Sequence, residues 1–135
     1  MDLGPSKNLS WKELACHDGT PYPDLWLDRA LVLAAEFEEI RKRCEDRPIT
    51  VLSAYRTDQY NLLVGGAKDS QHLYGRALDL ETPFGLSLEA FRAIIKEVAL
   101  ERGILKGLGF YSDRTGTHID CREAQDLVIW DSFSK

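Results

Sequence analysis

The chain has 135 residues, of which 44% are hydrophobic and 29% are charged, and its net charge is -5 at neutral pH. This length and composition are those of one soluble domain, residues 1–135, that can bury its own core. The acidic balance argues against nucleic acid as a partner, and no apolar run approaches the ~18 residues of a membrane span. We expect a monomer without a nucleic-acid or membrane partner.

Two features bear on the cellular compartment. The polar start of the chain, residues 1–8, lacks the apolar segment of a signal peptide, so we expect it to be flexible and the protein to be cytoplasmic on synthesis. The three cysteines, Cys16, Cys44 and Cys121, are odd in number and far apart. They predict reduced thiols and not a disulfide framework or a cysteine-based zinc site.

The first predicted elements are a short helical turn and a loop within residues 9–23, followed by a helix from Asp24 to about residue 43. In the loop, His17 and Asp18 precede Gly19, and this spacing is typical of turn chemistry and not of a ligand pair. The charged residues between 36 and 43 predict a solvated helix face.

The next apolar stretch, residues 48–53, is β-branched and predicts a central strand. This strand carries Arg56 to the end of the sheet. A guanidinium there can bond a substrate carboxylate or a developing oxyanion through two nitrogens. A structural ion pair to a nearby aspartate explains the same residue equally well.

The rest of the chain predicts an α+β domain, a small and mostly antiparallel sheet with flanking helices. Residues 60–67 read as a helical turn ended by glycines, and Ser87 caps a helix over residues 88–102 that Gly103 ends. Residues 105–111 and 117–122 predict two antiparallel strands, and residues 127–130 a closing strand or turn.

The segment SQHLYGRALD, residues 70–79, sets a histidine and a carboxylate seven positions apart around a glycine. Imidazole nitrogen and carboxylate oxygen both bind zinc at roughly 2.0 to 2.2 Å. An odd spacing cannot place both side chains on one face of a single strand. A turn at Gly75 would let His72 end one segment while Asp79 points inward from the strand that follows.

A third candidate ligand is His118, which shares one face of a short predicted strand with Asp120. Together with His72 and Asp79 it would make three protein ligands, which leave the fourth tetrahedral position to water, as in catalytic zinc sites. The alternative for each histidine is a buried, hydrogen-bonded side chain without a metal.

These segments resemble the zinc D-Ala-D-Ala carboxypeptidase family, a group that also includes vancomycin-resistance dipeptidases, some phage endolysins and hedgehog domains. The blocks that carry the resemblance are ACHDGT (15–20), SAYRT (53–57) with YN (60–61), VGGA (64–67), SQHLYGRALD (70–79), and GFY (109–111) with THID (117–120). The resemblance implies a Zn²⁺ cofactor held by His72, Asp79 and His118, with Arg56 orienting or polarising the substrate. It also implies hydrolysis of peptide bonds next to D-amino acids in peptidoglycan, at a terminal D-Ala-D-Ala or within a cross-link.

The chain departs from the family pattern at one position. Relatives place an acid three residues before the second histidine, where this chain has Thr115. Asp120, on the strand face of His118, and Asp113, in the preceding loop, are therefore the candidate catalytic carboxylates, with Asp120 favoured. Asp120 could equally orient His118 without taking a proton from water.

Three residues within the same blocks are the predicted substrate contacts: Arg56, Ser70 and Tyr55. Because the expected substrate is part of the cell wall, we expect the protein to act there after release by a non-classical route. The competing hypothesis is a non-catalytic zinc-containing module that binds the wall or assembles with a partner, which the missing acid at Thr115 permits.

Overall fold

The structure, a computed structural model, describes residues 4–131 of the chain. Helices dominate the first third of the chain, and the strands lie in the middle and at the end. The elements in chain order are α1 (Trp11–Leu14), the 3-10 helix η1 (Asp24–Trp26), α2 (Leu27–Arg43), β1 (Val51–Ser53), α3 (Asp58–Leu63), the 3-10 helix η2 (Gln71–Tyr74), β2 (Ala77–Glu81), α4 (Leu88–Arg102), β3 (Gly107–Gly109), β4 (Gly116–Asp120) and β5 (Val128–Trp130).

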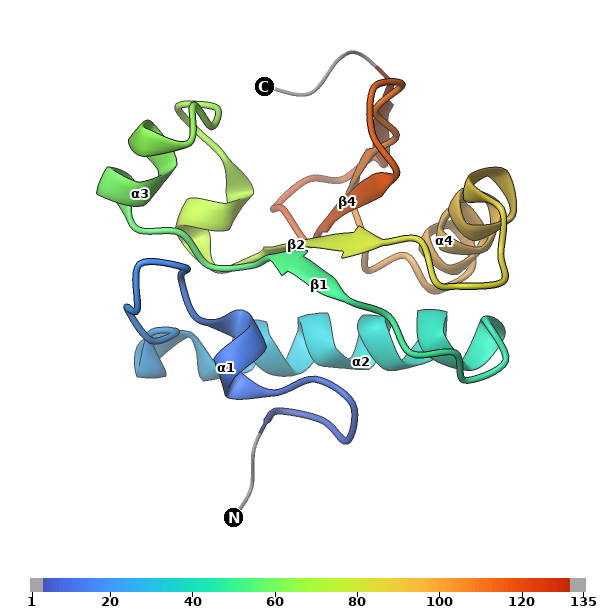
Figure 1. The fold of residues 1–135 in the computed structure, drawn as a ribbon, viewed down its shortest axis with the longest axis horizontal. Helices are drawn as coiled ribbons and strands as arrows, with labels where there is room; N and C mark the ends of the chain where they lie inside the picture. Colours follow the sequence, from blue (N-terminus) through green and yellow to red (C-terminus); the bar gives the residue numbers. More distant parts are fainter. Residues whose placement is uncertain (1–3, 132–135) are drawn as a thin grey trace.

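Within residues 4–131, five strands form one sheet in the order β1-β2-β4-β3-β5. Figure 1 shows the labelled strands β1, β2 and β4 of this sheet. Neighbouring strands are antiparallel except β3 and β5, which are parallel. The predicted α+β fold with a mostly antiparallel sheet is therefore confirmed. In the register of β2 with β4, Asp79 stands directly opposite His118. This pairing brings together two residues that are 39 positions apart in the sequence.

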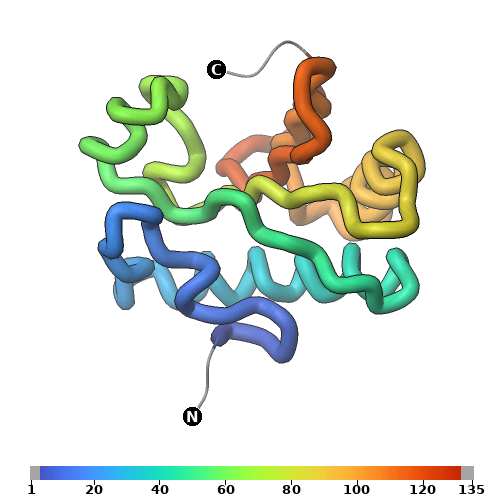
Figure 2. The backbone as a smooth tube through the Cα atoms, viewed as in Figure 1, coloured from blue at the N-terminus to red at the C-terminus, as the bar shows by residue number. Residues whose placement is uncertain are grey.

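The prediction that residues 48–53 form a central strand is wrong, because β1 lies at the edge of the sheet. Of its two apolar residues, Val51 is half-buried against the core, whereas Leu52 is 38% exposed and lines the smaller cavity beside the sheet. Helix α1 packs against β1 with Leu14 fully buried, and the Tyr55 amide donates to the Leu14 carbonyl at 3.1 Å. Figure 2 shows this blue segment beside the green chain that runs from β1 toward α3.

The two long helices begin and end close to the predicted positions. Ser87 accepts a hydrogen bond from the Ala90 amide at 3.0 Å, and Gly103 ends α4 with a left-handed φ of 67°. Helix α2 packs against α4, and the carboxylate of Glu36 is paired with Arg102 at 3.0 Å. The predicted solvated face of α2 is therefore wrong at Glu36, which is only 1% exposed because α4 covers it.

Strand alternation separates the apolar core from a polar face. Leu78, Leu80 and Ile119 are fully buried in the core. Asp79 and His118 belong to the opposite face of the same two strands. The helices cover the apolar side, so the polar face is left for a cleft.

The amino-terminal segment was expected to be flexible over residues 1–8, of which residues 1–3 lie outside the described part. Ser6 and Asn8 are instead bound to Glu38 on α2. The Ser6 hydroxyl donates to that carboxylate at 2.6 Å, and the Asn8 amides donate at 2.7 Å. Within residues 4–131, none of the helices has both the length and the apolar composition needed to cross a membrane.

Candidate metal centre

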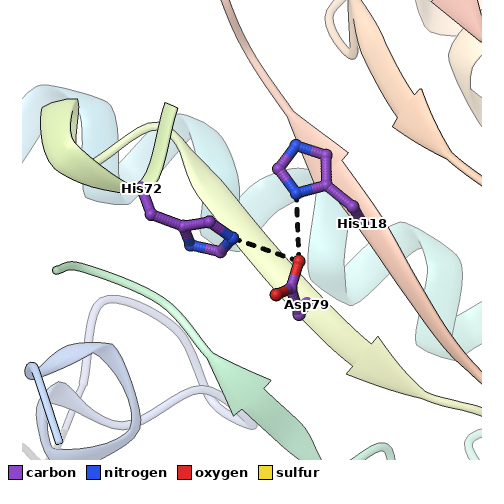
Figure 3. A group of neighbouring side chains, drawn as sticks. All are labelled: His72, Asp79 and His118. Atoms are coloured by element: carbon purple, nitrogen blue, oxygen red, sulfur yellow. Dashed lines mark hydrogen bonds and ion pairs between the residues drawn. The ribbon is translucent and has the colours of Figure 1, made fainter. Parts of the chain in front are cut away.

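The structure brings together the three predicted ligands, His72, Asp79 and His118 (Figure 3). Their donor atoms all lie within 4.8 Å of one another. His72 Nε2 is 3.1 Å and His118 Nδ1 is 3.0 Å from the same oxygen, Asp79 Oδ1. A tetrahedral zinc ion with ligand bonds of roughly 2.1 Å separates its donors by about 3.4 Å, so the two nitrogen–oxygen distances are close to what the metal requires.

The turn at Gly75 lets two neighbouring segments converge on this point. His72 lies on η2, whose first turn is capped by the Ser70 hydroxyl, and Gly75 ends η2 with a left-handed φ of 68°. A Cβ at Gly75 would meet a ring atom of Trp26 at 2.6 Å and the Tyr22 hydroxyl at 2.9 Å. A larger residue is therefore excluded by these contacts as well as by the left-handed φ. The predicted turn between His72 and β2 is confirmed.

Each histidine already uses one ring nitrogen to hold its orientation. His72 Nδ1 lies 2.6 Å from the Ala54 carbonyl oxygen, which can only accept, so this nitrogen carries the proton. His118 Nε2 lies 2.7 Å from Asp120 Oδ2 and donates to it in the same way. The other nitrogen of each neutral ring therefore presents its lone pair toward Asp79.

Two lone pairs directed at one carboxylate oxygen need a cation between them. Burial lowers the pKa of His72, which disfavours a second proton there. Burial has the same effect on His118, but hydrogen bonds to Asp120 and Asp79 outweigh it and raise the pKa to about 9. Without a metal, a second proton therefore lies between His118 Nδ1 and Asp79, in the place that a bound cation would take. Burial acts to raise the pKa of Asp79, yet His72 and His118 hold it well below its usual range. The residues thus fit a divalent cation bound by two neutral imidazoles and one carboxylate, a donor set suited to Zn²⁺.

Asp120 is completely buried and has no free access to the cleft. Its carboxylate accepts from His118 and also from Arg122, whose Nε and Nη2 donate at 2.8 and 2.6 Å. Gly107 on β3 makes this possible, because a Cβ there would contact the Asp120 carboxylate. Of the two roles that the sequence left open for Asp120, the geometry supports orientation of His118.

We predict that Asp120→Asn weakens zinc binding about 10- to 100-fold, the usual effect of removing a carboxylate behind a histidine ligand. The amide keeps the shape of the side chain but loses the charge that stabilises the His118 N–H donor. Competition with a chelating dye measures the affinity. Asp126→Asn, at an exposed position, is the matched control and should bind zinc like the unchanged protein. Equal affinities for the two variants would contradict the assigned role.

Arg56 reaches the centre from the segment after β1. Its Nε donates to Ser53 at 3.2 Å and its Nη1 donates to Asn61 at 3.1 Å, while Nη2 lies 3.6 Å from Asp79 Oδ2. A Cβ at Gly66 would come within 2.9 Å of Arg56 Nη1, so this glycine makes room for the guanidinium. The ion pair to an aspartate that the sequence allowed is therefore present, and it holds the guanidinium beside the three candidate ligands.

Two cavities, of about 200 Å³ and 480 Å³, open onto the triad. Several residues line both cavities, and among them Arg56 and Arg114 carry a cationic donor and Tyr111 a hydroxyl donor. The shared residues are Arg56, Asp79, Tyr111, Arg114 and His118. The larger cavity is also lined by Lys68 and Arg122. A chain with a net charge of -5 thus has a cleft with several cationic side chains, which favours an anionic substrate.

The other predicted site residues are divided between the cleft and its surroundings. Ser70 lines the larger cavity, as expected of a substrate contact. Tyr55 lines neither cavity, because its ring packs against Tyr22 and Trp26 with centroids 6.1 and 5.9 Å away. Asp113 is exposed in the loop between β3 and β4 and also lines neither cavity.

The cleft also contains residues that the sequence interpretation did not assign to it. Asp18 has the predicted turn role, accepting from the Thr20 amide at 2.9 Å, but His17 lines the smaller cavity and stacks on Tyr60. Asp69 lines the larger cavity, and it is the one carboxylate besides Asp79 that lines either cavity in residues 4–131. The sequence feature that could have indicated a place in the cleft for His17 and Asp69 is their position: His17 lies within a block that resembles known peptidases, and Asp69 lies next to one.

A family model described as Peptidase M15 matches residues 7–120, a span that contains the whole triad. The chain belongs to this peptidase family. The zinc D-Ala-D-Ala carboxypeptidase of Streptomyces albus G is 34% identical over 92 residues, which are 67% of this chain and 34% of that relative. The chain thus aligns with about a third of the relative's length. Membership of the M15 family indicates a metallopeptidase domain.

Proposed function

We propose that this M15 family protein is a zinc-dependent peptidase that hydrolyses peptide bonds involving D-amino acids in peptidoglycan stem peptides. The observation that carries the proposal is the convergence of His72, Asp79 and His118, with both rings already oriented, beside a cationic cleft. The carboxypeptidase similarity supports the choice of substrate. The proposed site of action is the cell wall, where this substrate occurs.

The residues of the chain supply distinct parts of the reaction. His72, Asp79 and His118 would hold the ion, which when bound activates water and polarises the scissile carbonyl. The Ala54 carbonyl and Asp120 keep the two rings in the required tautomer. Arg56, fixed through two of its nitrogens, can donate to the carbonyl oxygen as negative charge develops there.

The test is hydrolysis of muropeptides by the zinc-loaded protein, followed by mass spectrometry. We expect loss of a terminal D-alanine or cleavage of a D-amino acid cross-link, which a chelator stops and added zinc restores. The identity of the fragment distinguishes a carboxypeptidase from an endopeptidase. A matched stem peptide ending in L-Ala-L-Ala should stay intact. A fully metallated protein that leaves a broad muropeptide panel unchanged would contradict the proposal.

A second candidate is a non-catalytic zinc-containing module that binds the wall or a partner. It is favoured by Thr115 at the position of the family acid, and by the absence of both Asp113 and Asp120 from the residues that line the cavities. This candidate predicts zinc-dependent binding to peptidoglycan without any cleaved product. Turnover therefore separates the two candidates, whereas zinc content does not.

A further inference from the structure

Tyr111 occupies a position in the cleft that no role described so far explains. It is the second residue after β3 and lines both cavities that open onto the triad. A Cβ added at Gly109 would meet Tyr111 Cζ at 2.9 Å, His118 Cβ at 2.9 Å and Trp130 Nε1 at 3.0 Å. The phenol end of Tyr111 therefore lies over the β3 backbone, next to a predicted ligand and next to the last strand.

Trp130 on β5 fixes the direction of this phenol. The two rings meet edge to face with centroids 6.4 Å apart, and the Trp130 indole acts on the Tyr111 hydroxyl as a hydrogen-bond partner that lowers its pKa. An indole N–H can only donate, so the Tyr111 oxygen must be the acceptor. The hydroxyl proton of Tyr111 is consequently left for another partner. The ring centroids of Trp130 and His118 are 5.3 Å apart, and the guanidinium of Arg122 lies over the Trp130 ring. These two contacts constrain the position of Trp130.

The surroundings keep the hydroxyl protonated at neutral pH. A phenol has an ordinary pKa of about 10, and burial raises the pKa of Tyr111 further. The net direction is upward. Arg56 and Arg114 line the same two cavities, so Tyr111 is an uncharged donor in a cleft that otherwise offers cationic ones.

We propose that the Tyr111 hydroxyl is a catalytic residue, which donates a hydrogen bond to the oxygen of the scissile carbonyl as it becomes an oxyanion, and that Trp130 is its positioning residue. This inference rests on the proposed peptidase function. In the hydrolysis, the oxygen of water bonds to the carbonyl carbon and the π electrons move to the carbonyl oxygen. When the carbon–nitrogen bond breaks, those electrons re-form the carbonyl, and the two protons of water end on the departing amine. Tyr111 donates a hydrogen bond throughout and transfers no proton.

Tyr111→Phe tests this role by removing one oxygen. For the zinc-loaded variant we expect kcat to fall about 10- to 100-fold with KM and zinc content unchanged, because the donor acts on charge that develops only in the transition state. Trp130→Phe should lower kcat less, and the double variant should resemble Tyr111→Phe alone. Tyr74→Phe, a half-exposed tyrosine on η2 whose ring lies outside both cavities, is the matched control.

A binding measurement separates this inference from the proposed function. The probe is the phosphinate analogue of D-Ala-D-Ala, whose tetrahedral oxygens imitate the oxyanion, titrated into each zinc-loaded protein by calorimetry. Tyr111→Phe should weaken phosphinate binding about tenfold or more and leave binding of D-Ala-D-Ala itself unchanged. Such a result supports the inference even if no muropeptide is cleaved. Equal phosphinate affinity in the unchanged protein and in Tyr111→Phe, whether tight or undetectable, overturns it.

Discussion

His118→Ala is expected to abolish stoichiometric zinc binding and to lower peptide hydrolysis by roughly a thousandfold or more, given that enzymes accelerate their reactions by 10⁶-fold or more. The substitution removes one of three donors that lie within 4.8 Å of one another. It also leaves the buried carboxylate of Asp120 without the ring N–H that donates to it at 2.7 Å. Zinc content by elemental analysis and turnover on muropeptides measure the two losses.

The third histidine of the chain provides the matched control. His17 lines the smaller cavity but is not part of the triad, so His17→Ala should retain about one zinc per chain. A thermal shift gives an independent readout, because zinc at a thousand times its Kd stabilises the folded protein by about 4 kcal/mol. The unchanged protein and His17→Ala should both show this shift, and His118→Ala should not. Full zinc content in His118→Ala would refute the assignment of the ligands.

Arg56→Lys is expected to lower kcat about a hundredfold while zinc stays bound. In Arg56, two guanidinium nitrogens contact Ser53 and Asn61 while the third faces Asp79. Lysine retains the positive charge but has a single nitrogen, so it cannot make these contacts at the same time. The loss should appear in kcat, because an oxyanion donor acts mainly in the transition state. Steady-state kinetics on a D-Ala-D-Ala peptide, with zinc content measured on the same samples, gives the result.

Arg47→Lys is the control for this substitution, since Arg47 pairs with Glu45 at the surface, away from both cavities. Its kcat should equal that of the unchanged protein. If Arg56→Lys lost zinc in proportion to activity, Arg56 would serve mainly to hold Asp79 in place. Unchanged kcat and unchanged zinc content would contradict both roles of Arg56.

Much of the candidate centre follows from local rules. The spacing of His72, Gly75 and Asp79 predicts a turn between two ligands, and the structure has η2, a left-handed glycine and β2 in that order. The alternation of side chains in a strand predicts that His118 and Asp120 share a face, and their side chains meet at 2.7 Å. These predictions succeed because each depends on dihedral angles within a few residues.

The errors involve residues whose surroundings come from distant segments. Residues 48–53 have the composition of a central strand, but α1 rather than a second strand covers β1. Glu36 lies in a charged run that reads as solvated, yet its carboxylate is buried and pairs with the partly exposed Arg102 on α4. Tyr55 adjoins Arg56 in sequence, yet it turns into an aromatic cluster while Arg56 faces the cleft. The edge position of β1, the burial of Glu36 and the direction of the Tyr55 side chain cannot be predicted from the residues next to them in the sequence.

The sequence by itself determined the residue types of the candidate centre, the turn at Gly75 and the strand faces, because steric limits on the backbone act over a few residues. Only the tertiary structure decided that Asp79 stands opposite His118, that Asp120 is enclosed behind His118, and that Trp130 reaches Tyr111. These facts depend on the order and register of strands that are far apart in the chain, and many registers are compatible with one local pattern until the whole core is packed.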